Sequence, residues 1–363
     1  MHSTTRQMVG LTIAAAAASS LLLSVPSATA ADSARLAAAP NDKSTIGLFG
    51  AQDPTYDGVY RQSLSLIALD TAGARVPAPS VKWLLRQQCD NGRFPAYTDL
   101  AGKCGVGDGD ATSMATIALR AVGERAAARN ALNWLISQQT RSGGWKYNAT
   151  FGPNANTTGL VVQAMLAMNI DPTTVARRNT GLDYIRSVQL RCSSDAADRG
   201  ALDYVRETPL VANNFATSQA TQALAGASLP VEPRVVRAKL PALTCPKAGA
   251  QPGAAAAAAG YLGRTIKDNE GGIPGDFGPG TDLGSTANAV LSLVAAGYGS
   301  VQISSAMVTL ETSATVFTRD VEGVRPAAAA ALVLAAHATR GDPRSVGTTN
   351  PVRDILDSRT LAG

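Results

Sequence analysis

Histidine is the scarcest functional residue in this chain of 363 residues, which contains two. His2 lies at the N-terminus, and His337 lies inside the alanine-rich run Ala327–Ala338. Zinc sites built from several histidines and two-histidine iron sites are therefore excluded, and a Ser-His-Asp triad would have to use His337. The sequence has neither a Gly-x-Ser-x-Gly elbow nor a Walker-type phosphate loop. We expect no metal site and no cofactor.

Aromatic residues are also few, at 5% of the chain, and charged residues make up 16%, whereas 45% of the residues are hydrophobic. This composition is typical of a globular chain with a large core. The formal net charge of +5 is spread along the sequence, which argues against nucleic-acid binding. After Val25, charges or glycines interrupt every apolar run before the roughly 18 residues of a membrane span. We expect no membrane span.

Residues 1–30 have the pattern of a secretory signal peptide. Arg6 precedes an apolar run from Val9 to Val25, and Ala28-Thr29-Ala30 supplies the small residues of a cleavage site. We therefore expect a secreted, extracellular monomer in which residues 31–48 form a flexible N-terminal segment. Because the four cysteines are even in number and lack Cys-x-x-Cys spacing, we expect two disulfides, Cys89–Cys104 and Cys192–Cys245.

A segment rich in Trp, Gln and Gly recurs about every 50 residues, a period typical of repeat architectures. The first copy runs from Trp83 through Gln88 to Phe94, and the second from Trp134 through Gln139 to Trp145. Weaker copies begin at Tyr184 and Tyr261.

Polar turns and apolar stretches alternate with these segments. Helix-capping Asp, Asn, Ser or Thr residues precede most of the stretches, and Gly73, Gly123, Gly226 and Gly297 follow four of them, as C′ glycines do. The apolar stretches are 64–69, 114–122, 160–168, 220–224, 289–296 and 327–338.

These signals predict an all-α chain of about six helix hairpins over residues 49–363, with no strand. A hairpin cannot bury both faces alone, so the six must stack, and we expect them to close into a ring. The alanine-rich helices would form the inner wall and the Trp-bearing helices the outer layer. The proline-rich stretch 230–252 is expected to be an inserted loop.

The segment from Trp134 to Trp145 resembles the repeat of prenyltransferases and squalene or oxidosqualene cyclases, a terpenoid-cyclase-type α/α toroid. That resemblance implies six inner and six outer helices. The activities of the family do not follow from its fold. Asp108-Gly109-Asp110-Ala111 lacks the last carboxylate of the cyclase Asp-x-Asp-Asp motif, and no histidine is placed to complete a prenyltransferase zinc site. The sequence also lacks a complement-like thioester motif and the β domain of vitamin B12 carriers.

If the ring closes, the N-termini of the inner helices meet at one rim, which is a favourable place for a polar ligand. Most polar residues there have a helix-capping explanation, whereas Tyr60 and Arg61 have no evident structural reason. Rim candidates for ligand binding are Asp57, Tyr60, Arg61, Asp108, Asp110, Asn154, Asn156, Asn213 and Asp282.

Two functions stay open. The protein could bind a small molecule, glycan or peptide at the rim, which the scarcity of aromatic residues favours. Alternatively, it could be a terpenoid-cyclase-like or polysaccharide-degrading enzyme that uses rim carboxylates such as Asp57, Asp108 or Asp110.

Overall fold

The computed structural model describes residues 45–52, 54–95, 104–245, 251–276 and 278–361. Contacts divide the chain into two units, Met1–Pro40 and Asn41–Gly363, and all described residues belong to the second. The predicted signal peptide and residues 31–44 of the expected flexible segment lie outside the described residues.

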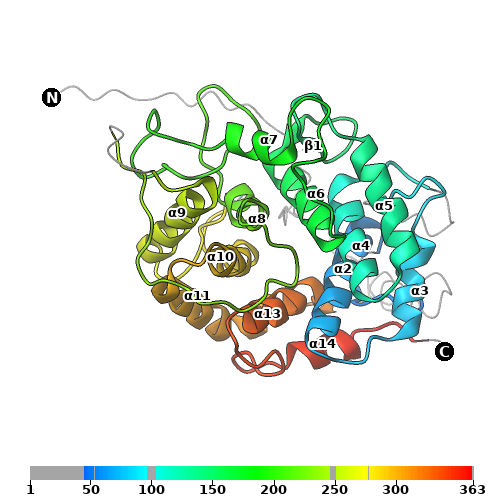
Figure 1. Cartoon of the computed structure of the whole chain (residues 1–363). Helices are drawn as coiled ribbons and strands as arrows, with labels where there is room; N and C mark the ends of the chain where they lie inside the picture. The colour runs from blue at the N-terminus through cyan, green and yellow to red at the C-terminus, as the bar shows by residue number, and fades with distance from the viewer. Residues whose placement is uncertain (1–44, 53, 96–103, 246–250, 277, 362–363) are drawn as a thin grey trace, which may run out of the picture. The chain divides into compact units, whose positions relative to one another are not determined.

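Inner and outer helices alternate along the described chain (Figure 1). The inner helices are α2 (Pro54–Thr71), α4 (Gly109–Ala121), α6 (Ala155–Ala167), α8 (Asn214–Leu224), α10 (Leu283–Ala296) and α13 (Pro326–Ala338). The outer helices are α3 (Ala78–Arg86), α5 (Arg125–Ser137), α7 (Gly181–Ser187), α9 (Ala254–Asp268), α11 (Ser300–Thr312) and α14 (Pro351–Asp357). A short helix, α12 (Ala314–Thr318), follows α11.

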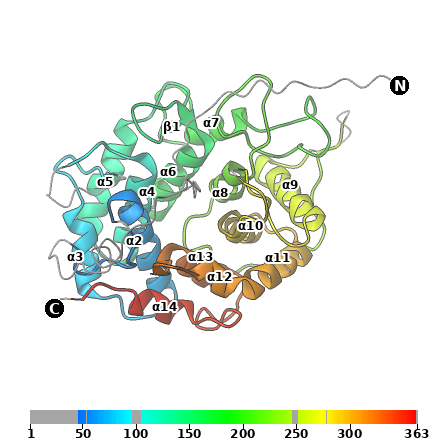
Figure 2. The same ribbon diagram turned by 180° about the vertical axis from the view of Figure 1, so that it is seen from behind.

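The inner helices form a closed ring, as expected for an α/α toroid. Each packs against the next in chain order, and α13 packs against α2 (Figure 2). The first described segment completes the closure, because the backbone amides of Gly47 and Gly50 donate to the carbonyls of Thr360 and Ser358. Leu48, in the segment expected to be flexible, is buried, and its carbonyl accepts from the amide of Thr360.

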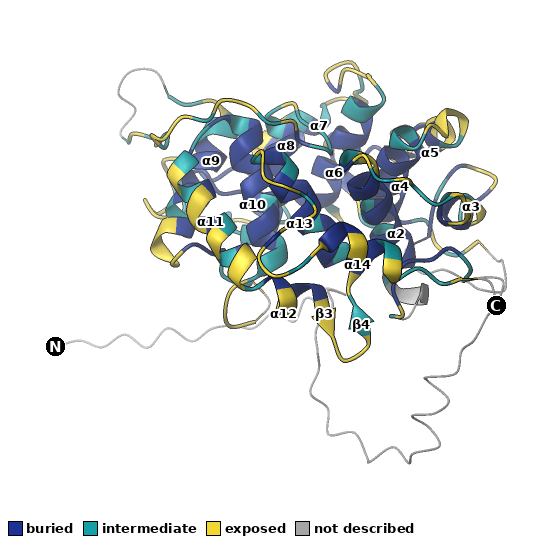
Figure 3. Cartoon of the chain, turned by 90° about the horizontal axis from the view of Figure 1, so that it is seen from below, coloured by how far each residue is buried: buried dark blue, intermediate teal, exposed yellow. Residues whose placement is uncertain are grey.

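Burial separates the two layers (Figure 3). Nearly every residue of α6 and α13 is buried, whereas the outer helices keep one exposed face. Helices that are apolar all round are stable only when they are surrounded by other elements. The small side chains of the alanine-rich inner helices allow neighbouring helices to approach closely.

The turn after each well-matched repeat joins two successive outer helices. The Nε2 amide of Gln88 donates to the carbonyls of Gly92, in its own turn, and Ala127, on α5. Gln139 repeats this contact with Gly143 and with Val175 and Asn179, which precede α7. The repeat glutamine is therefore structural, as its position at a helix C-terminus indicated.

A second contact joins each of these turns to the inner helix that follows. The backbone amide of Phe94 donates to Thr112 Oγ1, and that of Trp145 donates to Thr158 Oγ1. Leu202 and Ile273 make the equivalent bonds to Thr217 and Thr286, although their repeats are weak in sequence.

Helix ends follow the predicted signals. Asp108, Asn154, Asn213 and Asp282 are N-caps whose side chains accept from a backbone amide three residues later. Each of the four predicted C′ glycines, at positions 73, 123, 226 and 297, has a positive φ.

The expectation of no strand is wrong in a minor way. Two-residue strands pair as β1 (Trp145–Lys146) with β2 (Pro153–Asn154) and as β3 (Arg319–Asp320) with β4 (Gly323–Val324). They form because the connections before α6 and α13 fold back on themselves, which a search for longer alternating runs does not detect.

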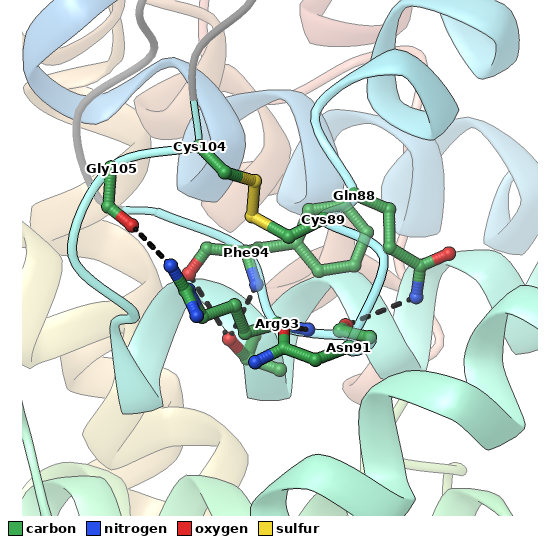
Figure 4. Close-up of a disulfide and its surroundings, with 9 residues drawn as sticks. Gln88, Cys89, Asn91, Arg93, Phe94, Cys104 and Gly105 are labelled. Carbon is green, nitrogen blue, oxygen red and sulfur yellow. Dashed lines mark hydrogen bonds between the residues drawn. A yellow bond between two sulfur atoms is a disulfide. The ribbon is translucent and has the colours of Figure 1, made fainter.

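Both predicted disulfides are present, Cys89–Cys104 and Cys192–Cys245 (Figure 4 shows the first). The second ties the turn after α7 to the proline-rich insert, whose described parts, 230–245 and 251–252, contain no helix. No helix in the described ranges is long and apolar enough to cross a membrane.

Candidate functional site

A cavity of about 210 Å³ lies among the inner helices, and its wall extends from their first turns, at Gly284 and Ala327, past their middle, at Gln222 and Leu334. We call it the mouth cavity. Leucines and alanines supply most of its wall, and its polar side chains come from four inner helices and from the residue that precedes α13. The lining residues are Tyr60, Leu64, Leu160, Gln163, Gln219, Gln222, Leu229, Gly284, Ala287, Asn288, Leu291, Phe317, Arg325, Ala327, Ala328, Ala331 and Leu334.

Three buried glutamines line the mouth cavity. The exposed fractions of Gln163, Gln219 and Gln222 are 1%, 4% and 1%. Gln163 donates its Nε2 to the backbone carbonyl of Gln219 at 3.4 Å, and the Nε2 of Gln219 donates to the hydroxyl of Tyr60 at 3.0 Å. The Oε1 atom of each glutamine is buried and accepts no hydrogen bond from any described residue. An unpaired buried acceptor costs about 1–3 kcal/mol, so three on side chains that line the same cavity require a specific explanation.

Two carboxyl groups lie at the start of α4. Asp108 is buried and accepts from the backbone amide of Ala111 at 2.7 Å, while the partly buried Asp110 accepts from Asn156 Nδ2 on α6 at 3.4 Å. Burial raises the pKa of both carboxyls, and the charge of Asp110 raises the pKa of Asp108 further. The pair therefore holds a proton at a higher pH than isolated aspartates do.

Tyr60 connects this carboxyl pair to the mouth cavity. Burial, followed by the charge of Asp110, raises the pKa of Tyr60 to about 12. Burial and the charges of Asp110 and Asp108 also raise the pKa of Tyr204. Both phenols therefore stay protonated near the carboxyl pair and can donate hydrogen bonds.

Aromatic rings gather around this end of the ring despite their scarcity in the chain. Tyr147 lies edge-on to Phe151 with ring centroids 6.0 Å apart, and Tyr204 lies 6.5 Å from Phe215. Tyr60 and Phe317 line the cavity itself. The low aromatic content therefore does not exclude a ligand that packs on rings, because the connections before α6 and α8, together with α2, α8 and α12, contribute rings there.

The structure brings Tyr60, Asp108, Asp110 and Asn156 together, whereas other rim candidates serve their own helices. Asn154 and Asn213 cap α6 and α8. Asp282 accepts from both the amide and the hydroxyl of Ser285 at the start of α10.

The expectation that Arg61 has no structural reason is wrong. Its side chain is 2% exposed, and its guanidinium donates to the backbone carbonyls of Phe49 and Gln52 and forms an ion pair with Asp57. Arg61 thus anchors the first described segment to α2. Asp57 lies in the first turn of α2, and its carboxylate pairs with Nη1 of the Arg61 guanidinium.

Sequence reasoning missed the three glutamines, together with Asn288, Arg325 and Tyr204. The spacing of Gln219 and Gln222 places them on one helix face. However, α8 is buried on nearly all sides, so no amphipathic pattern indicates which face points to the ring axis.

No family model matches the sequence, and no curated protein matches it. Among solved structures, ent-copalyl diphosphate synthase from Streptomyces platensis is similar with a TM-score of 0.51 and 16% identity, over 78% of this chain and 50% of that one. The chain thus spans half the length of that synthase. An α-amylase from Clostridium perfringens is similar with a TM-score of 0.54 and 10% identity, over 85% of this chain and 95% of that one. At these identities the similarities show the α/α-toroid fold and no activity.

Proposed function

We propose that the chain binds a small, hydroxyl-bearing molecule, such as a single sugar ring, in the mouth cavity. The observation that carries the proposal is the set of three buried amide oxygens, on Gln163, Gln219 and Gln222, that lack a donor within the described chain. Hydroxyl groups are donors of the right kind, because several of them on one small ligand can each reach a separate acceptor. Ionised acids are disfavoured, since these acceptors would face a negative charge.

The size and walls of the cavity support this ligand class. Drug-sized ligands typically occupy about 300–1,000 Å³, so a cavity of about 210 Å³ suits a smaller molecule. Leu160, Leu291 and Leu334 provide apolar surface against which the C–H face of a sugar ring can pack. A long isoprenoid chain would bring no donors for the amides and would exceed this volume.

A second candidate function is acid-catalysed conversion of the bound molecule. It is favoured by the Asp108–Asp110 pair, because a carboxyl that keeps its proton near neutral pH can act as a general acid. Tyr60 lies between that pair and the cavity. A hydrolytic reaction on a saccharide would use the same ligand as simple binding, so product analysis separates an enzyme from a carrier.

The proposed cellular setting is extracellular. The predicted signal peptide and the two disulfides support export from the cytosol, since disulfides persist in oxidising compartments. We propose that the exported protein acts as a monomer.

A thermal-shift screen of the purified chain tests the proposal. The panel contains neutral mono- and disaccharides, isoprenoid alcohols and short peptides. A ligand at about 100 times its dissociation constant adds about 2.7 kcal/mol of stability, which raises the melting temperature measurably. Stabilisation by a neutral saccharide is the expected result. Stabilisation by the isoprenoids or peptides alone, or by no compound, would contradict the proposal.

A further inference from the structure

A second hollow of about 240 Å³ lies beside the Cys89–Cys104 disulfide, outside the mouth cavity. We call it the outer pocket. It is lined by the polar or aromatic side chains of Arg93, Trp134, Gln138, Lys146, Tyr147 and Asn148, together with Val106, Gly107 and Ala149. None of these residues lines the mouth cavity.

Gly107 keeps the floor of the outer pocket open. A Cβ atom at this position would lie 2.7 Å from Arg93 Cδ and 2.7 Å from Trp134 Cζ2. Both distances are well below normal van der Waals contact, so the absence of a side chain lets the arginine stem and the indole ring lie close to the same point.

The charged residues among the described lining of the outer pocket are both cationic. Arg93 and Lys146 both line it, and none of its described lining residues is acidic. Arg93 donates through Nη2 to the Gly105 carbonyl at 3.1 Å, and this bond holds the guanidinium in place (Figure 4). Its Nε is buried and makes no hydrogen bond to any described residue. Lys146 is exposed and forms no ion pair within the described ranges.

We propose that the outer pocket binds a saccharide that carries a carboxylate, such as a uronic acid unit. Arg93 and Lys146 hold the carboxylate, because charge-assisted hydrogen bonds to a guanidinium are strong and directional. Trp134 and Tyr147 offer ring surface to the apolar face of the sugar, and the amides of Gln138 and Asn148 lie within the same pocket for its hydroxyls.

Tyr147 places this pocket next to the candidate site. It lines the outer pocket, and its backbone carbonyl accepts from the amide of Gly109, which lies between Asp108 and Asp110, at 2.7 Å. An acidic saccharide bound in the outer pocket would therefore contact Tyr147, which lies next to the Asp108–Asp110 pair. The inference goes beyond the proposed function, because the outer pocket has its own residues and stands even if the mouth cavity binds nothing.

Calorimetric titration of the full chain with digalacturonate tests the proposal. Two further probes separate the sources of the signal: the dimethyl ester of the same disaccharide, which is neutral, and inorganic phosphate. We expect digalacturonate to bind at least about tenfold more tightly than its ester, because the ester cannot pair with the two cations. Equal binding of acid and ester, binding of phosphate alone, or no binding would overturn the proposal.

Matched variants assign the binding to this pocket. Arg93→Gln and Lys146→Gln should each weaken digalacturonate binding about tenfold or more. Arg129→Gln removes the same charge from an exposed position on α5 that does not line the pocket, and it should leave binding within about twofold. Gln222→Leu alters the mouth cavity and should not change digalacturonate binding. The proposal for the outer pocket and the proposal for the mouth cavity can therefore fail independently of each other. Equal effects of Arg93→Gln and Arg129→Gln would overturn the assignment.

Discussion

Arg61 and Gln222 are both about 1% exposed on inner helices, but they differ in what surrounds their polar atoms. The guanidinium of Arg61 is paired with backbone carbonyls and with Asp57, whereas the Oε1 of Gln222 has no donor among the described residues. A buried polar group that is fully paired stabilises the fold, and one that is left unpaired costs stability. This difference separates structural residues from candidate ligand contacts.

Replacement of Arg61 by methionine should therefore destabilise the protein. The carbonyls of Phe49 and Gln52 would lose their donor, at about 1–3 kcal/mol for each buried group left unpaired. Chemical denaturation measures the loss. Arg178→Met, at an exposed position, should change the free energy of unfolding by less than about 0.5 kcal/mol. Similar stabilities for the two variants would show that Arg61 has no structural role.

The carboxyl pair should make stability depend on pH. The pKa values of Asp108 and Asp110 are raised on folding, so above about pH 4, where aspartates of the unfolded chain ionise, the folded state binds more protons. The pair's contribution is complete below that pH and is lost as pH rises through the raised pKa values. Asp110→Asn should flatten this decline and make the variant more stable than the wild type at pH 7.

Asp183→Asn is a control variant for which the pH dependence of stability should change in the opposite direction. The backbone amide and hydroxyl of Thr180 lower the pKa of Asp183, so its contribution is present at neutral pH and is lost as pH falls. This variant should be less stable than the wild type at pH 7. Denaturation curves at pH 4, 5.5 and 7 measure both, and a steeper decline in Asp110→Asn than in the wild type would contradict the raised pKa.

At the scale of elements, the glycines of the repeat turns fix how closely successive outer helices approach. Gly143 has a φ of 93°, and a Cβ atom there would overlap the carbonyl oxygen of Thr180 at the start of α7. A Cβ atom at Gly92 would likewise overlap a backbone carbonyl oxygen of α5, and one at Gly200 would overlap a backbone carbonyl oxygen of α9. The sequence period predicted these turns because the same contact recurs and requires the same residue.

Gly143→Ala should cost more stability than Gly123→Ala. The two glycines have nearly equal φ values, 93° and 88°, so both substitutions incur the left-handed penalty of about 1–2 kcal/mol. A Cβ at Gly123 meets nothing within 4 Å, whereas one at Gly143 displaces α7. Thermal denaturation of both variants gives the difference, and equal melting temperatures would show that the close approach contributes nothing.

Helix positions, caps and turns could be predicted from the sequence because each depends on a local pattern. The caps Asp108 and Asn154 and the C′ glycines are examples. The walls of the mouth cavity could not be predicted, since which side of α8 or α10 faces the axis depends on how six helices pack together. The role of Arg61 was missed for a similar reason, because its partners Phe49 and Gln52 lie outside its helix.

At the scale of the whole molecule, the two ends of the described chain close the ring together. The segment around Leu48 and Phe49 pairs with the residues that follow α14, and α13 packs on α2. The first described segment thus completes the hydrogen bonding at the end of the last helix hairpin, α13–α14. Such a closed ring has no free end hairpin, so the residues at its seam should open only with the ring itself.

Hydrogen exchange tests this closure. The amides of Gly47, Gly50 and Thr360 are bonded across the seam and should exchange as slowly as amides of the inner helices. The amide of Val321, at the exposed turn between β3 and β4, should exchange quickly. Exchange of the seam amides at the rate of Val321 would show that the ring is open at this point.

The central claim is that the mouth cavity keeps amide oxygens for a hydroxyl-bearing ligand, and one pair of variants tests it most directly. Gln222→Met removes one such oxygen, and Gln302→Met removes another buried, unpartnered oxygen on α11, outside the cavity. Without ligand, both variants should unfold at a higher temperature than the wild type, by the equivalent of up to about 1–3 kcal/mol. With the most stabilising neutral saccharide added, Gln302→Met should keep the ligand-induced shift and Gln222→Met should lose it. Retention of the full shift in Gln222→Met would contradict the account.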